Sequence, residues 1–151
     1  EQENWCSIIH SFHQGSVRDP KNSIVIYNES GTGKMTMDGL AVYENAVKSI
    51  SRSIRETANI HHLDLSDIDQ FILHQANKKI VDTVCRKLEL DSNKFFCNIS
   101  QFGNTGASSI PLCLESIFNS GGRRDKKSTA ILSAFGAGFT YGSFLMELKK
   151  Y

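Results

Sequence analysis

Three separate stretches of the sequence carry groups that could stabilise negative charge on a substrate oxygen. His74 directly follows the apolar run Phe71–Leu73, Asn104 lies in a glycine-containing loop, and Gly136–Gly138 reads Gly-Ala-Gly. A histidine with an ordinary pKa near ~6.5 is mostly neutral at neutral pH, and its Nε2–H donates a hydrogen bond without adding a full charge. Amide side chains and backbone N–H groups are further uncharged donors, and donors aimed at one oxygen form an oxyanion hole.

Each of these groups also has an ordinary structural role. His74 could be a hydrogen-bonded histidine of the core, Asn104 a helix cap, and the glycines a tight turn. Ligand sites of layered α/β folds gather at strand ends and in the loops that follow them, which is where all three groups are expected. The spacing alone leaves both interpretations open.

The segment Glu29–Met35 resembles a phosphate-binding loop but departs from that motif at two positions. Asn28 stands where the first glycine belongs, and Met35 stands where a Ser or Thr would hold the metal. We expect a surface turn here rather than a nucleotide site.

Two pairs of histidines are candidate metal ligands by residue type. His61 and His62 are adjacent in a turn, so their rings cannot converge as ligands at positions i and i+4 of a helix do. His10 and His13 lie near the first expected strand, and no second cluster completes a ligand set for either pair. We expect surface or loop histidines and no metal site.

The apolar periodicity predicts the elements that position these groups. The clearest is an amphipathic helix from Gly39 to Ile60, with Asp38 placed to cap it, and a second helix opens just past Asn77. The other expected elements are a strand at 5–12, a long loop at 14–36 with at most one short strand, strands at 71–74 and 94–100, a loop at 101–107, a helix at 107–118, and strands at 128–135 and 139–148. This order indicates an α/β layered domain with a mixed sheet.

The helix expected from Ala107 to Phe118 differs from the first one. It carries one charge, Glu115, and small residues fill its first half, so we expect most of its circumference to be buried against a close neighbour. Pro111 should either kink this helix or lie where the hydrogen-bond ladder has already ended.

Length and charge restrict the class of protein. A chain of 151 residues fits one domain, and a net charge of +1 with both signs spread along the chain gives no sign of nucleic-acid or membrane binding. The sequence has no run near the ~20 apolar residues of a membrane span and no secretory signal at its start, so we expect a cytoplasmic protein. Its first residue is not Met, which is typical of a piece of a longer protein.

The cysteines give no sign of a metal or redox site. Cys6, Cys85, Cys97 and Cys113 are widely spaced, without a Cys-x-x-Cys pair, so neither a zinc ribbon nor a redox dithiol is indicated. Four free thiols suit a reducing compartment.

Taken together, "FILHQAN", "FGNTGASSIP" and "AFGAGFTYGSFLMEL" resemble the C-terminal half of the beta-ketoacyl-acyl carrier protein synthase III family, within the thiolase-like superfamily. "MTMDGLAVYENAV" is similar to the start of that half's first helix, and the resemblance runs from about Cys6 to Leu148. It implies a thiolase-like α/β fold, a mixed five-stranded sheet layered with helices in the order βαβαβαββ. Residues 1–36 would be the last strand of the N-terminal half plus a long loop, and residues 37–151 the condensing-enzyme domain.

The resemblance implies a condensing enzyme with a Cys-His-Asn triad. The cysteine takes an acyl group from acyl-CoA, and malonyl on acyl carrier protein then loses CO2 and attacks the acyl thioester. His74 and Asn104 would donate hydrogen bonds to the malonyl thioester oxygen. The backbone N–H of Ala137 would help hold the acyl-cysteine carbonyl; relatives often have glycine there, so the methyl group raises the question of a positive φ. The implied substrates are acyl-CoA and malonyl-acyl carrier protein, and no cofactor or metal is implied.

The nucleophile that the resemblance requires is missing. In the family it lies in the N-terminal half, at a helix start among small residues, where the helix dipole lowers its pKa. None of the four cysteines has that setting, and we interpret each as a packed thiol. We therefore expect the chain alone to be inactive, with the absent N-terminal half packed on the helix at 107–118 and a homodimer at full length.

The lysines after His74 suggest a docking surface for acyl carrier protein. Lys79 matches a position where the family often has a basic residue, and Arg86 shares its helix face, with Lys78 beside it. Asp82 lies four residues from both Lys78 and Arg86, so a solvated face with local ion pairs is the alternative.

Two other functions fit parts of the sequence. The chain could be a non-catalytic subunit that assembles with a separate cysteine-bearing chain. A cysteine hydrolase with a Cys-His-Asn set is disfavoured by the "GNTGAS" and "GAG" motifs. The starter acyl group, and the choice between fatty-acid initiation and a specialised pathway, do not follow from the sequence.

Overall fold

The computed structural model of the chain describes residues 5–19, 21–29, 32–120 and 127–150. Its centre is a mixed sheet in the order β1 (Trp5–Ser16), β7 (Thr140–Lys150), β6 (Ser128–Gly136), β4 (Gln70–Leu73) and β5 (Phe95–Phe96). β7 runs antiparallel to both β1 and β6, whereas β4 is parallel to β6 and β5. The mixed five-stranded sheet expected from the sequence is confirmed.

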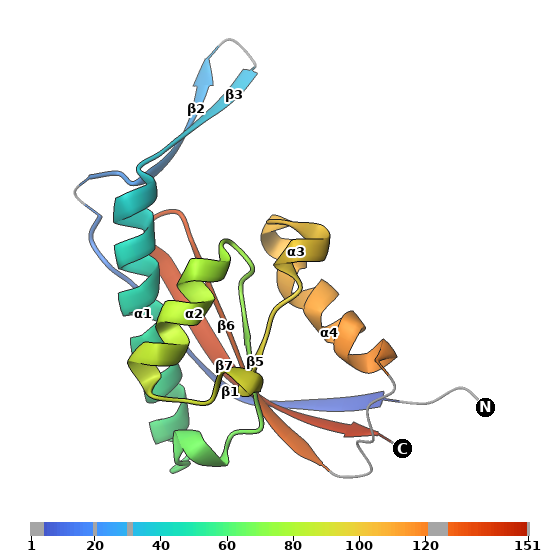
Figure 1. Cartoon of the computed structure of the whole chain (residues 1–151). Helices are drawn as coiled ribbons and strands as arrows, with labels where there is room; N and C mark the ends of the chain where they lie inside the picture. The colour runs from blue at the N-terminus through green and yellow to red at the C-terminus, as the bar shows by residue number, and fades with distance from the viewer. Residues whose placement is uncertain (1–4, 20, 30–31, 121–126, 151) are drawn as a thin grey trace.

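Helices cover both faces of this sheet. Helices α1 (Gly39–Ile60) and α2 (Lys78–Leu88) lie on one face, and α4 (Ser109–Asn119) lies on the other, with the short α3 (Ile99–Phe102) before it (Figure 1). Apart from a hairpin between β1 and α1, the chain order is βαβαβαββ, as expected.

The central strand β4 shows why the layers pack as they do. Phe71 and Leu73 are fully buried in the cluster under α1 and α2, and Ile72, pointing the other way, is fully buried in the cluster under α4. A short apolar run without polar alternation is typical of a parallel strand that is covered on both faces.

Two helices begin where the sequence predicts. Helix α1 has the expected bounds, and the Asp38 carboxylate accepts from the backbone N–H groups of Leu40 and Ala41. The Asn77 side chain accepts from the Lys79 backbone N–H at 2.9 Å and so caps α2.

The expected long loop at 14–36 is wrong. Strand β1 continues to Ser16, and β2 (Ile24–Glu29) pairs antiparallel with β3 (Thr32–Met37) in a hairpin that projects from the body (Figure 1). Ile26 is 68% exposed and Met35 is 64% exposed, so no buried face left a period-2 signature in the sequence. Lys34 lies within β3 rather than at a helix start, which argues against the phosphate-loop interpretation.

Two boundaries near the candidate site also differ from the expectation. The strand expected at 94–100 is only two residues long, because the backbone N–H of Asn98 donates to the Gln75 side chain instead of to a sheet neighbour. Helix α4 begins at Ser109, after a 3-10 turn at Gly106–Ser108. Pro111 therefore falls in the first turn, where its missing N–H breaks no intrahelical bond and imposes no kink.

In the chain alone, helix α4 is buried on one side, and the neighbour expected around the rest of its circumference is the N-terminal half. Its fully buried residues form one stripe against the sheet: Ser109, Cys113 and Ile117. Phe12, which is 65% exposed, and Ile110 line an apolar groove of about 290 Å³ between β1 and α4. A partner that covers this face stays a prediction.

We expect the isolated chain to self-associate through this face, because apolar surface of this kind is costly to leave in water. Phe12→Ser should weaken the association, whereas Leu40→Ser, also at an exposed position (67%) but at the start of α1, should not. Sedimentation velocity over a concentration series, with binding of a hydrophobic dye, measures the effect. A clean monomer with little dye binding would contradict the expectation.

Candidate active site

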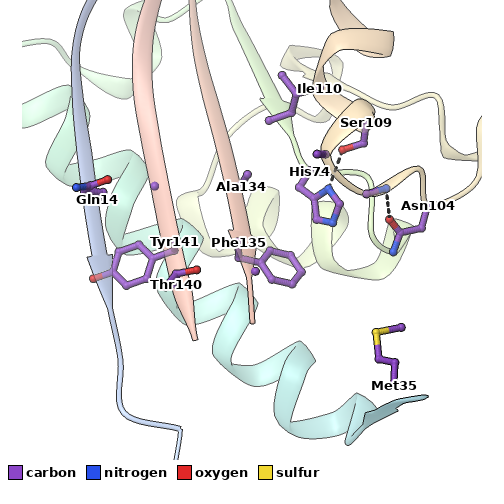
Figure 2. Close-up of a pocket in the computed structure, with 14 residues that line it drawn as sticks. Gln14, Met35, His74, Asn104, Ser109, Ile110, Ala134, Phe135, Thr140 and Tyr141 are labelled. Carbon is purple, nitrogen blue, oxygen red and sulfur yellow. Dashed lines mark hydrogen bonds between the residues drawn. The ribbon is translucent and has the colours of Figure 1, made fainter. Parts of the chain in front are cut away.

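A cavity of about 830 Å³ opens where β4 and β6 end and β7 begins. Its wall includes His74 after β4, Asn104 in the loop before α4, Phe135 on β6, and Met35 from the hairpin (Figure 2). The structure thus brings together His74 and Asn104, which the sequence analysis singled out on different segments.

His74 is held by its backbone and by its ring. Its N–H donates to the Ser133 carbonyl at 2.8 Å, which continues the pairing of β4 with β6. Its Nδ1 lies 2.7 Å from Ser109 Oγ, and the edge of its ring meets Phe135 at a centroid distance of 5.2 Å. Burial lowers the pKa of His74, so the imidazole is neutral at neutral pH.

Asn104 stabilises a local turn and does not cap a helix. Its Oδ1 accepts from the Gly106 backbone N–H at 3.0 Å, and Gly103 and Gly106 both have a positive φ that glycine adopts without strain. With Oδ1 engaged, the amide Nδ2 is the group left for the cavity. Figure 2 shows the carboxamide of Asn104 and the ring of His74 on the same side of the cavity.

Ala137 lies at the tip of the β6–β7 turn. Its carbonyl accepts from Thr140 Oγ1 at 3.2 Å, and its neighbours Gly136 and Thr140, not Ala137 itself, line the cavity. The positive φ of this turn belongs to Gly138, so the methyl group of Ala137 meets no backbone conflict.

A buried network behind the site ties β4 to the opposite helical layer. Gln75 is 1% exposed; its Nε2 donates to the Leu73 carbonyl at 2.7 Å, and its Oε1 accepts from the Asn98 N–H at 3.2 Å. Cys113 on α4 donates from its thiol to Asn98 Oδ1 at 3.2 Å. The end of β4, the loop after β5 and α4 are therefore fixed relative to one another.

The rings of three histidines from the two pairs contact other side chains. His61 Nε2 bonds Ser11 Oγ at 2.6 Å, His10 Nε2 lies 3.3 Å from the Glu147 carboxylate, and His13 Nδ1 lies 3.2 Å from Ser53 Oγ. Within the described part of the chain, no group of three or more His, Cys, Asp or Glu residues could hold a metal ion.

None of the three cysteines whose side chains are described lines the cavity. Cys113 is fully buried, and burial raises its pKa to about 11. Burial also raises the pKa of Cys85, and Cys97 is exposed on a different groove, beside Lys78. The Cys6 side chain lies outside the described residues.

The basic residues of α2 differ in how they are held. Lys78 forms an exposed ion pair with Asp82 at 2.7 Å, as the alternative interpretation expects, whereas Arg86 donates to the Thr83 hydroxyl at 2.8 Å instead. Lys79 is exposed, and no described residue bonds its ammonium group. Of the proposed docking residues, Lys79 is thus the one that has no bonding partner for its side chain in the described part of the chain.

Sequence reasoning missed Ser109, Phe135 and Met35. Ser109 was visible only as one of several small residues at a helix start, and Phe135 only as an apolar residue of a strand. Met35 belongs to the hairpin that the sequence did not reveal.

Comparisons with known proteins agree on one group. Residues 58–148 match the family described as 3-oxoacyl-[acyl-carrier-protein (ACP)] synthase III C terminal. A beta-ketoacyl-[acyl-carrier-protein] synthase III of Ehrlichia chaffeensis is 38% identical over 130 residues, which are 82% of this chain and 40% of the relative. The solved 3-oxoacyl-(acyl carrier protein) synthase III of Pseudomonas aeruginosa superposes with a TM-score of 0.83 at 34% identity, over 91% of this chain and 43% of that one.

The priming beta-ketosynthase of the R1128 polyketide pathway has the same fold, with a TM-score of 0.82 at 25% identity over 93% of this chain and 45% of that one. The fold is therefore thiolase-like. The chain spans well under half the length of the curated relatives it matches: 40% in the Ehrlichia protein and 36% in that of Streptococcus agalactiae. Among the described residues, no helix is long and apolar enough to cross a membrane.

The three described cysteines should differ sharply in reactivity. At pH 7 a thiol with a pKa of about 11 is a thiolate in only roughly one molecule in 10⁴, so Cys113 should resist iodoacetamide in the folded chain while exposed Cys97 is alkylated. Peptide mass spectrometry after timed labelling measures each site, and Cys97→Ser should remove the fast reaction. Alkylation of Cys113 as fast as Cys97 would show that α4 is not packed as described.

Proposed function

The chain belongs to the 3-oxoacyl-[acyl-carrier-protein] synthase III family and matches the C-terminal part of its members, and on this basis we propose that it contributes His74 and Asn104 to a decarboxylative condensing centre. The reaction joins an acyl-CoA starter to malonyl-acyl carrier protein, as in fatty-acid or related acyl and polyketide synthesis. The observation that carries the proposal is that two neutral side chains face one cavity, each with one group already bonded to the protein.

The geometry suits the decarboxylation step. When CO2 leaves the malonyl group, the electron pair moves onto the α-carbon and the thioester oxygen, where negative charge develops. His74 and Asn104 have Nδ1 and Oδ1 engaged by Ser109 and Gly106, which leaves Nε2 and Nδ2 for that oxygen. Because the lowered pKa keeps His74 neutral, it stabilises charge that appears in the transition state rather than binding the malonyl carboxylate in the ground state.

The nucleophile of this proposal lies on a different stretch of polypeptide. The chain spans 40% of its Ehrlichia relative, and its three described cysteine side chains lie away from the cavity. The chain alone is therefore expected to be inactive. The exposed side of α4, with its apolar groove, supports assembly with a cysteine-bearing half, and it equally favours the alternative of a non-catalytic subunit.

Substitution of the two donors tests the proposal in the chain combined with its cysteine-bearing half. His74→Ala and Asn104→Ala should each lower the rate of malonyl-acyl carrier protein decarboxylation by about 10²–10³, the usual cost of one oxyanion donor. Acyl-enzyme formation, read by intact mass spectrometry, should persist in both variants. Asn119→Ala, an exposed change at the end of α4, serves as the matched control. Condensation by the chain alone, or full decarboxylation by His74→Ala, would refute the proposal.

We further propose that acyl carrier protein docks at Lys79. The Lys79 ammonium group is exposed and has no partner among the described residues, so it is available to attract an acidic surface through screened electrostatics. Lys79→Glu should raise KM for malonyl-acyl carrier protein several-fold, less so at high salt, and leave acyl transfer from acyl-CoA unchanged. Lys48→Glu, an equally exposed reversal on α1, is the control. Equal effects of the two reversals would remove Lys79 as a specific contact.

A further inference from the structure

Ser109 and His74 meet although they lie 35 residues apart in the sequence. His74 follows β4, and Ser109 is the first residue of α4 and is 2% exposed. Figure 2 shows the serine Oγ directed at the imidazole, and the distance from Oγ to Nδ1 is 2.7 Å. The bond engages Nδ1, but the distance alone does not say which of the two atoms carries the hydrogen.

The hydrogen on Ser109 can be placed by counting donors and acceptors. The Gln75 backbone N–H, which can only donate, lies 3.3 Å from Ser109 Oγ, so the oxygen accepts there. If His74 also donated from Nδ1, the serine hydrogen would need a third partner, and no other described group bonds Oγ. A buried donor without an acceptor is unfavourable. In the arrangement that satisfies every group, Ser109 donates to Nδ1.

A neutral imidazole that accepts at Nδ1 must carry its hydrogen at Nε2. We propose that Ser109 is a positioning residue that fixes His74 in the Nε2–H tautomer, so that the ring presents a donor to the cavity beside the Asn104 amide. The inference rests on the proposed function and explains how its histidine becomes a donor rather than an acceptor. Ser109 does not touch the substrate; it acts through the ring.

The neighbouring residues hold Ser109 in place for this task. His74 and Gln75 are consecutive, and both bond the same hydroxyl, one through a ring nitrogen and one through the backbone. The Gln75 side chain is in turn anchored to the Leu73 carbonyl and to the Asn98 N–H. A shift of α4 along the sheet would therefore break the serine contact to His74 and to Gln75 together.

Nitrogen NMR of the ¹⁵N-labelled chain tests the proposal without any assay of activity. Long-range proton–nitrogen spectra at pH 7.5 distinguish protonated from unprotonated ring nitrogens. Wild-type His74 should show a protonated Nε2 and an unprotonated Nδ1. In Ser109→Ala the ratio of the Nε2–H to the Nδ1–H form should fall roughly five- to tenfold, the bias that one hydrogen bond supplies. Ser109→Thr, which keeps the hydroxyl, should restore the ratio.

The matched control is Ser108→Ala, one residue earlier, whose side chain makes no capping bond; it should leave the ratio unchanged. A proton on Nδ1 of the wild type overturns the proposal even if Ser109→Ala fails to fold, and a folded Ser109→Ala with wild-type populations overturns it as well. Because the spectra do not depend on condensation, the expected tautomer together with a lack of condensation by the chain combined with its cysteine-bearing half would refute the proposed function alone.

Discussion

The burial of β4 on both faces is the constraint on which the rest of the molecule depends. This strand is four residues long, yet Phe71, Ile72 and Leu73 fill the two apolar clusters that hold the helical layers to the sheet. A strand covered on both faces cannot slip by one residue, because every side chain would then point into the wrong layer. The first residue after the strand, His74, is consequently held in one fixed place at the carboxyl end of β4.

The polar groups around the cavity are also held in fixed positions, in their case by hydrogen bonds within the protein. His74 and Asn104 each have one group that is hydrogen-bonded to the protein and a second group that is available to the cavity. Gln75, Asn98 and Cys113 satisfy one another in the layer behind, so the ends of β4 and α4 share one set of bonds. Preorganisation of this kind removes the need to reorient donors when charge appears.

The sequence predicts those parts of the fold that have a local signature. Helix α1 was predictable to the residue because a capping aspartate and a buried stripe at helical spacing coincide, and His74 and Asn104 were predictable because their motifs resemble those of a family. The hairpin left no signature, since its side chains are exposed on both faces. Ser109 could not be assigned a role, because its meaning depends on a contact with a residue 35 positions away. The small residues of α4 indicate a close neighbour, but they do not say which molecule that neighbour is.

The hairpin β2–β3 has a consequence for how this protein can diversify. It supplies Met35 to the cavity wall but contributes almost nothing to the buried clusters, since only Ile24 at its base packs against them. A change at Met35 alters the shape of the cavity at little cost in folding free energy, whereas a change at Phe71 or Leu73 destabilises the whole fold. The molecule thus separates a part of the cavity wall that can change shape freely from the buried strand that holds His74 in place.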